Sequence, residues 1–244
     1  MSGKSQYEVI RDDMRAKIDS GAWPIGQLIP SELQLAETYQ VSRPTIRHAM
    51  QDLVNEGRLE RRRRRGTIAC APKIDQGFTL SLRSFADEMI ANERIPRTQV
   101  LMLKRETASR TVAQALRLGE GAPVFKLVRV RFADNVPNVI NESYIPAEPV
   151  PAFGTFDFQE RSMYDVLREL GCPVVAAKRR LEVVRANPTQ ASLLDVETGD
   201  PLFLFTSVGM LEDGTPMEYS IATYRGESNS FEFEVSLKKE DAHA

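Results

Sequence analysis

The first seventy residues carry three helical patterns in close succession, and their order constrains the fold more than any other feature of the chain. Apolar residues recur at spacings of three and four between residues 7 and 18, which predicts an amphipathic helix that ends at Gly21. Ser31, with Gln34 three residues later, predicts a capping box at the start of a second helix. The apolar side chains of this second helix are expected to face inward: Leu33, Ala36 and Tyr39.

A third helix is expected to start at Ser42, with Pro44 in its first turn, where an N–H group has no intrahelical acceptor. The tight turn at residues 40–41 indicates a helix-turn-helix motif, whose second helix enters the major groove of DNA. Arginine can donate two hydrogen bonds to guanine, and a helix N-terminus favours a phosphate. The apolar stripe of the third helix leaves suitable polar side chains outside: Arg43, Thr45, Arg47, His48 and Gln51.

A basic turn follows the three helices. The run from Arg61 to Arg65 lies between two short strand-like segments and precedes Gly66, which predicts a two-stranded wing. Five arginines beside a glycine can follow phosphates or enter a narrow minor groove. A basic run alone is more often a solvated surface, but three helices, a capped third helix and a basic wing in this order are far more specific. The ordered set favours double-stranded DNA as a partner.

Charge is distributed unevenly along the 244 residues. Residues 1–73 contain 13 basic and 9 acidic side chains, a net charge of +4, whereas residues 74–244 contain 19 and 25, a net charge of −6. The whole-chain value of −2 conceals this division. Such asymmetry is typical of a nucleic-acid-binding part joined to an acidic module.

Cysteine and histidine are too few for several kinds of site. Cys70 and Cys172 lie far apart without metal-ligand spacing, so neither a disulfide framework nor a zinc site is expected. The histidines are His48 and His243, which argues against histidine-based catalysis in the larger part of the chain. We expect no metal, no cofactor and no catalytic residue. The polar start and the lack of a long apolar run lead us to expect a cytoplasmic protein without a membrane span.

An internal repeat organises the larger part of the chain. Three residues of one copy recur 78 positions later: Gly121, Pro123 and Phe125 as Gly199, Pro201 and Phe203. Each copy has the pattern of a helix, a Gly-x-Pro turn, a long strand, a turn with aspartate and a second strand. Two such units predict one antiparallel sheet with helices on it, an α+β domain. Before the repeat, residues 73–80 are expected to form a linker and Ser84 to cap a helix.

Two arginines share one face of the first long strand of the repeat. Val128, Val130 and Phe132 alternate with Arg129 and Arg131, so the apolar set is expected in the core and the arginines on the opposite face. Arginines two residues apart suit a phosphate or a carboxylate. A salt-bridged surface strand explains the same spacing equally well. The spacing leaves both interpretations open.

The motifs of the first seventy residues resemble the winged-helix domain of the GntR family of bacterial transcription regulators. The resemblance rests on Pro-Ser-Glu at 30–32, Ser-Arg-Pro-Thr-Ile-Arg at 42–47, Leu-Val-Asn-Glu-Gly-Arg-Leu at 53–59 and Arg-Gly-Thr at 65–67. Leu33 stands where the family has an arginine, and Arg64 stands where it has the first wing glycine. The resemblance implies DNA contacts by the recognition helix and the wing: Ser31, Ser42, Arg43, Thr45, Arg47, His48, Arg64, Arg65, Gly66 and Thr67.

Residues 75–240 resemble the UTRA effector-sensing domain of the HutC-type subfamily of this family, whose fold is similar to that of chorismate lyase. The matching motifs include the helix start at 83–89, the two arginines, Asn-Glu-Ser-Tyr at 141–144, Ser-Met-Tyr at 162–164 and Thr-Tyr-Arg-Gly at 223–226. Members with these motifs sense phosphorylated amino sugars. The resemblance therefore implies an effector site: Arg83, Ser84, Phe85, Arg129, Arg131, Glu142, Ser162, Tyr164, Glu218 and Tyr224.

The resemblance also implies a role for each part of that site. An anion would be held by Arg129, Arg131, Ser162 and the amides of Ser84 and Phe85. A helix N-terminus beside two arginines is a phosphate site on physical grounds as well. Arg83 replaces a small hydroxyl residue of the family, and it either strengthens the phosphate site or narrows it. Tyr164 and Tyr224 would flank the ligand. Glu142 and Glu218 would bind its hydroxyl groups or an amine.

Together these features predict a winged helix-turn-helix domain over residues 1–72, a linker over 73–80 and a UTRA domain for effector binding and dimerisation over 81–244. The expected function is that of a homodimeric transcription regulator, a repressor released from a palindromic operator by a small anionic metabolite. That metabolite is phosphosugar-like or carries another phosphate or carboxylate. The alternative is a chorismate-lyase-like enzyme domain tethered to DNA. An architectural DNA-binding protein without an effector is a third hypothesis, but it leaves the two arginines without a purpose.

Overall fold

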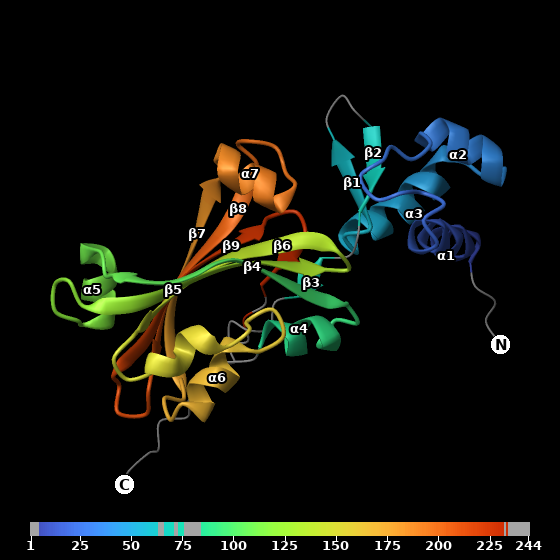
Figure 1. Ribbon diagram of the computed structural model, residues 1–244. Coiled ribbons are helices and arrows are strands. Elements are labelled where there is room, and N and C mark those ends of the chain that lie inside the picture. The colour runs from blue at the N-terminus through green and yellow to red at the C-terminus, as the bar shows by residue number, and fades with distance from the viewer. Residues whose placement is uncertain (1–4, 63–65, 71–72, 76–83, 232, 234–244) are drawn as a thin grey trace, which may run out of the picture. The chain divides into compact units, whose positions relative to one another are not determined.

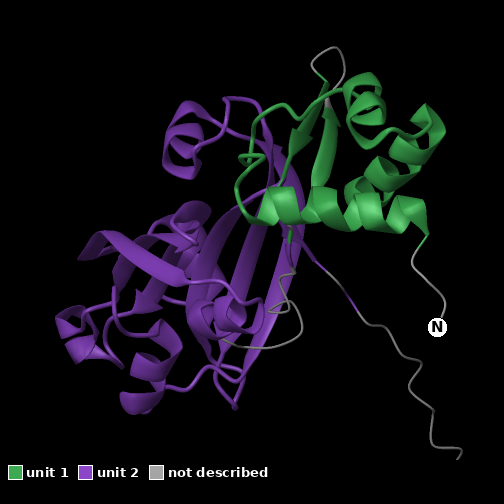
Figure 2. Cartoon of the chain, turned by 90° about the vertical axis from the view of Figure 1, so that its right-hand side faces the viewer, with its two compact units in different colours: residues 1–73 green, residues 74–244 purple. Residues whose placement is uncertain are grey.

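The computed structural model describes residues 5–62, 66–70, 73–75, 84–231 and 233 (Figure 1). The chain divides into two compact units, residues 1–73 and residues 74–244, which are coloured separately in Figure 2. In the part of the chain that the structure describes, every helix is too short or too polar to cross a membrane.

The first unit is a winged helix-turn-helix. Its helices are α1 (Gln6–Asp19), α2 (Glu32–Tyr39) and α3 (Arg43–Asn55), and its wing is formed by the antiparallel strands β1 (Leu59–Arg62) and β2 (Gly66–Ala69). The two expected helix caps are present. The Ser31 hydroxyl accepts a hydrogen bond from the Gln34 amide, and the Ser42 hydroxyl accepts one from the Thr45 amide. These bonds satisfy donors that a helix start otherwise leaves open.

The three helices enclose a core that includes Met14, Ile46 and Leu53. In α2 the buried leucine is Leu35, whereas Leu33 is 52 % exposed, so the expectation that Leu33 faces inward is wrong. The buried face of this short helix is centred on Leu35, and a residue two positions away is rotated by about 200° around the helix axis. An apolar side chain is therefore exposed at position 33.

The second unit is built on one six-stranded antiparallel sheet with the order β4-β5-β6-β9-β8-β7. The strands are β4 (Pro96–Thr107), β5 (Pro123–Ala133), β6 (Val136–Pro146), β7 (Ala176–Arg185), β8 (Pro201–Met210) and β9 (Pro216–Arg225). The helices are α4 (Phe85–Ala91), α5 (Arg110–Leu116), the 3-10 helix η2 (Pro151–Thr155), α6 (Met163–Glu169) and α7 (Pro188–Leu194). This is the antiparallel α+β domain that the sequence predicts.

The internal repeat corresponds to two copies of one unit, β4-α5-β5-β6 and β7-α7-β8-β9, and it begins one strand earlier than the sequence pattern indicates. β6 and β9, the last strands of the two copies, pair with each other at the centre of the sheet. Residue 116 ends α5 and residue 194 ends α7, which preserves the offset of 78 residues. The two halves of the sheet thus have the same order of strands and helix along the chain.

The helices lie on different faces of this sheet. α5 packs with Val124, Tyr144 and Tyr219, and α7 packs near Leu202, which places these helices on one face. On the other face, η2 and α6 form a cluster with the sheet, and α4 contributes to a second cluster with the neighbouring strands. Side chains on a strand alternate between the two faces, so each strand contributes to both layers.

Two residues of the expected linker at 73–80 form a strand in the structure. Ile74 and Asp75 form β3, which pairs in parallel with β10 (Asn229–Ser230) of the second unit. Ile74 is buried in the same cluster as Phe85, Phe205 and Tyr224. Two residues carry no periodicity, which is why this strand could not be seen in the sequence. Residues 76–83 lie outside the described part of the chain.

Candidate DNA-binding surface and anion pocket

The start of α3 presents the polar side chains expected of a recognition helix. Arg43 is exposed, and the side chain of Arg47 is 59 % exposed. Ser42 and Thr45 share a hydrogen bond between their hydroxyl groups, with 2.8 Å between the oxygens. This bond orients the Thr45 side chain on the first turn of the helix, which is the part of a recognition helix that contacts base edges.

The Arg47 guanidinium is held by a carboxylate from the preceding helix. Its Nε and Nη2 atoms donate hydrogen bonds to Oε2 of Glu32, at 3.1 and 2.9 Å. Arg61 of the wing strand β1 lies 3.8 Å from the other carboxylate oxygen. The hydrogen bonds from Arg47 lower the pKa of Glu32 below its usual value. Glu32 was not among the predicted site residues, although it directly follows Ser31 in the Pro-Ser-Glu motif.

The remaining predicted DNA contacts are placed as follows. The His48 ring stacks on Tyr7 of α1, with 4.3 Å between the ring centroids. Gly66 has a φ of +109°, a conformation that favours glycine, and a Cβ there would lie 3.0 Å from Leu28. Thr67 pairs with Arg61 across the wing. Two of the predicted residues lie outside the described part of the chain: Arg64 and Arg65.

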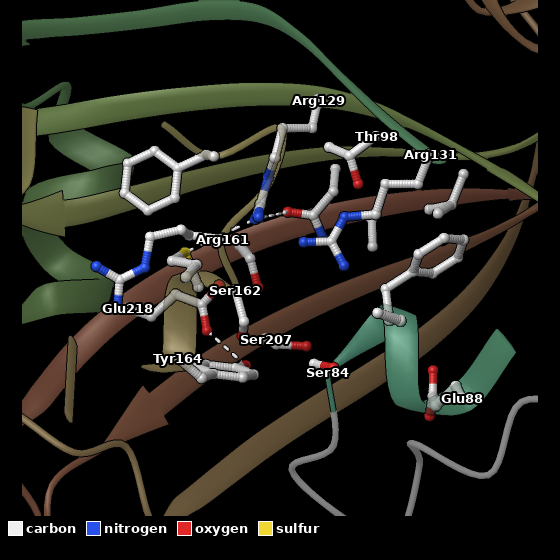
Figure 3. A pocket seen from close by; sticks show the side chains of 18 of the residues that line it. Ser84, Glu88, Thr98, Arg129, Arg131, Arg161, Ser162, Tyr164, Ser207 and Glu218 are labelled. Atoms are coloured by element: carbon white, nitrogen blue, oxygen red, sulfur yellow. Dashed lines mark hydrogen bonds between the residues drawn. The ribbon is translucent and has the colours of Figure 1, made fainter. Parts of the chain in front are cut away.

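The second unit contains a cavity of about 140 Å³ on the face of the sheet that carries α4 and α6 (Figure 3). Strands β5, β8 and β9 contribute its floor through Arg129, Ser207 and Glu218, among others. Ser84 and Ser162, the residues that precede α4 and α6, both line it. The Ser84 hydroxyl caps its helix, whereas the Ser162 side chain makes no cap hydrogen bond.

Both arginines of β5 point into this cavity (Figure 3). Arg129 is only 2 % exposed, and its Nη2 atom lies 3.5 Å from Oδ1 of Asn141 and 3.7 Å from the sulfur of Met163. The Nε atoms of Arg129 and Arg131 are buried and have no hydrogen-bond partner among the described residues. Burial lowers the pKa of Arg129, and Arg131 beside it lowers that pKa further. The arginines therefore belong to a pocket and not to a salt-bridged surface strand.

A carboxylate and two phenols also line the cavity. Glu218 is 2 % exposed and accepts hydrogen bonds from the hydroxyls of Tyr164, at 2.8 Å, and Ser143, at 3.1 Å. Burial and the charge of Glu218 raise the pKa of Tyr164. Burial is also the main cause that raises the pKa of Tyr224. Both phenols thus keep their protons at neutral pH, and the proton of Tyr164 is donated to Glu218.

The structure does not bring Glu142 to the pocket, which corrects the prediction that it contacts the effector. Glu142 lies on the opposite face of β6, where it accepts a hydrogen bond from Tyr144 and forms an ion pair with Lys126 at 3.2 Å. Its neighbours Asn141 and Ser143 face the pocket side instead. Since side chains of a strand alternate, Glu142 cannot share their face.

Several lining residues escaped the sequence analysis: Glu88, Thr98, Asn141, Arg161, Arg179 and Ser207. One of them carried a usable signal, because Ser207 lies 78 positions after Arg129 and occupies the matching place in the second copy of the repeat. Gly209 likewise matches Arg131, and a Cβ at this glycine would lie 2.9 Å from Val174 and 3.3 Å from Glu218. Arg83, which was predicted for this site, lies outside the described residues.

Comparison with known families agrees with both units. The model described as "Bacterial regulatory proteins, gntR family" matches residues 6–68, and the UTRA domain model matches residues 91–229. The chain belongs to the GntR family. Its winged helix-turn-helix and its antiparallel UTRA domain confirm the family and the fold that the sequence motifs predict.

Relatives of this GntR-family protein cover nearly its whole length. The HTH-type transcriptional repressor NagR of Bacillus subtilis is 31 % identical over 92 % of both chains. A histidine utilization repressor of Pseudomonas aeruginosa is 31 % identical over 81 % of this chain and 78 % of its own. Among solved structures, PhnF from Mycobacterium smegmatis is 28 % identical, with a TM-score of 0.73 over 93 % of this chain and 99 % of its own.

Proposed function

We propose that this GntR-family protein is a transcriptional repressor that leaves a palindromic operator when a small anionic metabolite binds the UTRA pocket. The observation that carries the proposal is the pair of buried Nε atoms of Arg129 and Arg131, which lack a partner among the described residues. A buried guanidinium whose N–H donors are only partly satisfied is costly, so such groups normally meet an opposite charge. A phosphate or carboxylate of the metabolite supplies that charge here.

The rest of the pocket limits what accompanies the anion. Glu218, Tyr164 and Tyr224 suit hydroxyl or amine groups of a ligand, because a carboxylate accepts hydrogen bonds and a phenol oxygen can accept them too. Two helix starts, at Ser84 and Ser162, contribute partial positive charge. A small phosphorylated sugar or a comparable phosphate or carboxylate fits this combination. We assign the pocket a sensing role and no catalytic one.

Repression and dimerisation follow from different arguments. Relatives over most of the chain carry the word repressor in their names, which supports repression here. One winged helix offers few base contacts, so useful specificity requires two copies on two half-sites, and a two-fold dimer implies a palindromic operator. The metabolite acts only if it binds the DNA-free arrangement more tightly than the DNA-bound one.

A variant of Arg129 tests the proposal. The wild-type protein first selects a specific duplex from a library with a randomised core, and inorganic phosphate, sugar 6-phosphates and small dicarboxylates are then screened by thermal shift. We expect at least one of these anions to raise the melting temperature and to release the selected duplex. Arg129→Ala should bind the duplex with unchanged affinity and lose both responses.

Arg180→Ala serves as the control, since Arg180 is an exposed arginine on β7 and does not line the cavity. This variant should respond as the wild type does. A normal response of Arg129→Ala would refute the pocket, and conversion of any screened anion into a product would show an enzyme instead of a sensor.

A further inference from the structure

Glu32 places a negative charge on the surface that carries the recognition helix. It is the first residue of α2, and its side chain is 22 % exposed. A carboxylate facing DNA phosphates is repelled by them, so its presence among DNA-contacting residues requires a reason. The helix start at Ser31 gains only a modest stabilisation from an acidic residue in its first turn.

The hydrogen bonds of Glu32 supply that reason. Arg47 donates to Oε2 from both Nε and Nη2, so one edge of its guanidinium group is occupied. Arginine has five N–H donors, and the three that remain lie on Nη1 and on the outer side of Nη2. That free edge can donate two hydrogen bonds to O6 and N7 of a guanine.

The same carboxylate also lies near the wing. Oε1 of Glu32 is 3.8 Å from Arg61, and the positive charge of Arg43 lowers the pKa of Glu32 in addition to the larger effect of Arg47. Side chains from α3 and β1 thus converge on one residue of α2. Immobilising a long side chain on binding costs roughly 0.5–1.5 kcal/mol, a cost that is reduced when the side chain is already oriented.

We propose that Glu32 is a positioning residue for operator recognition, which holds the guanidinium of Arg47 so that its free edge reads one base pair. The inference rests on the DNA-binding part of the proposed function and is independent of the effector. The inference predicts a change in affinity for the specific duplex that is opposite to the change expected from charge alone. Removing a negative charge should strengthen binding to any DNA, yet removing Glu32 should weaken binding to the specific duplex.

Glu32→Gln in the full-length protein tests this prediction, with Glu37→Gln as the matched control. Glu37 lies on the same helix, is exposed and loses the same charge, but makes no ion pair among the described residues. Affinities are measured for the duplex that the wild type selects from a randomised library and for a scrambled duplex of the same composition. Thermal unfolding of each variant checks that the fold is retained.

We expect Glu32→Gln to weaken binding to the selected duplex about three- to tenfold, which corresponds to the ordering cost of one arginine. Its affinity for the scrambled duplex should be unchanged or higher. Repeating the library selection with this variant should relax the preference at one position in each half-site. Glu37→Gln should alter both affinities in parallel and leave the selected sequence unchanged.

Glu32→Asp separates position from charge, because it keeps the carboxylate and shortens its reach. This variant should also lose selectivity without any change in net charge. If Glu32→Gln instead strengthens binding to both duplexes as Glu37→Gln does, the inference is overturned while operator binding stands. If the wild type selects no sequence at all, operator binding and the inference fail together.

Discussion

The exposed arginine of the recognition helix and the buried arginines of the pocket differ in an instructive way. Arg47 is largely exposed and nevertheless has a carboxylate partner, whereas Arg129 and Arg131 are enclosed and lack one among the described residues. Water can solvate the charge of Arg47, so Glu32 serves mainly to orient it. Within the pocket, the packed sheet orients the two guanidinium groups, and under the proposed function the anion of a ligand adds the opposite charge.

The largest expected difference between the exposed and the buried arginines is in how their binding affinities depend on salt concentration. Exposed arginines displace counterions from DNA, and a protein that contacts 6–10 phosphates loses roughly 10³–10⁵-fold in affinity between 50 and 200 mM salt. Buried charges are screened much less, so binding of inorganic phosphate to the pocket should weaken far less over the same range. Anisotropy with the selected duplex and calorimetry with phosphate measure the two slopes. Equal slopes would contradict the contrast.

A stability measurement on Arg129 gives the next largest effect. Arg129→Met removes a buried guanidinium and keeps an unbranched side chain of similar length, so the ligand-free protein should gain roughly 1–2 kcal/mol in free energy of unfolding. Phosphate binding should be lost with it. Arg47→Met changes an exposed position and should stay within about 0.5 kcal/mol.

Urea unfolding followed separately for the two units provides these values. A loss of stability in Arg129→Met would mean that the guanidinium is already well solvated in the empty pocket. In that case the pocket arginines would resemble the exposed one, and the contrast between the two regions would disappear.

The smallest expected effect is a difference in stability between variants of Ser31 and Ser162, each of which precedes a helix. Ser31 caps α2 through a hydrogen bond from the Gln34 amide, so Ser31→Ala should cost about 1 kcal/mol in stability of the first unit. The Ser162 side chain makes no such bond, so Ser162→Ala should change stability by less than about 0.5 kcal/mol. Phosphate affinity should respond in the reverse order. Chemical denaturation and calorimetry on both variants check this pairing.

Much of the fold could be predicted from the sequence because the signals involved are local. The caps at Ser31, Ser42 and Ser84 mark helix starts through bonds to the next turn, and these starts are where the structure has them. The repeat revealed the paired helices and hairpins because its glycines and prolines fix turns. The two-residue strand at Ile74 carries no such signal, since its pairing with β10 depends on residues more than 150 positions away.

The pocket was predictable only in part. Alternation along β5 placed Arg129 and Arg131 on one face, but the opposing residue on β6 depends on the register between the strands. In the structure Arg129 pairs with Asn141, so Asn141 shares its face and Glu142 does not. A register one residue different would have exchanged them. Arg179 lines the pocket from β7, which is an edge strand of the sheet on the side opposite β4. No local pattern in the sequence indicates that β7 contributes to the same pocket as β5.

The repeated β-α-β-β unit also bears on the distribution of charge around the cavity. The two copies share one connectivity, yet Arg129 and Arg131 of the first correspond to Ser207 and Gly209 of the second. The missing side chain at Gly209 leaves the space that Glu218 and Val174 occupy. The pair Arg129 and Arg131 is thus found in the first copy alone, whereas Glu218 and Arg179 come from the second copy. The two copies therefore line one cavity with different charged groups, and a ligand with two unlike ends would bind there in one preferred direction.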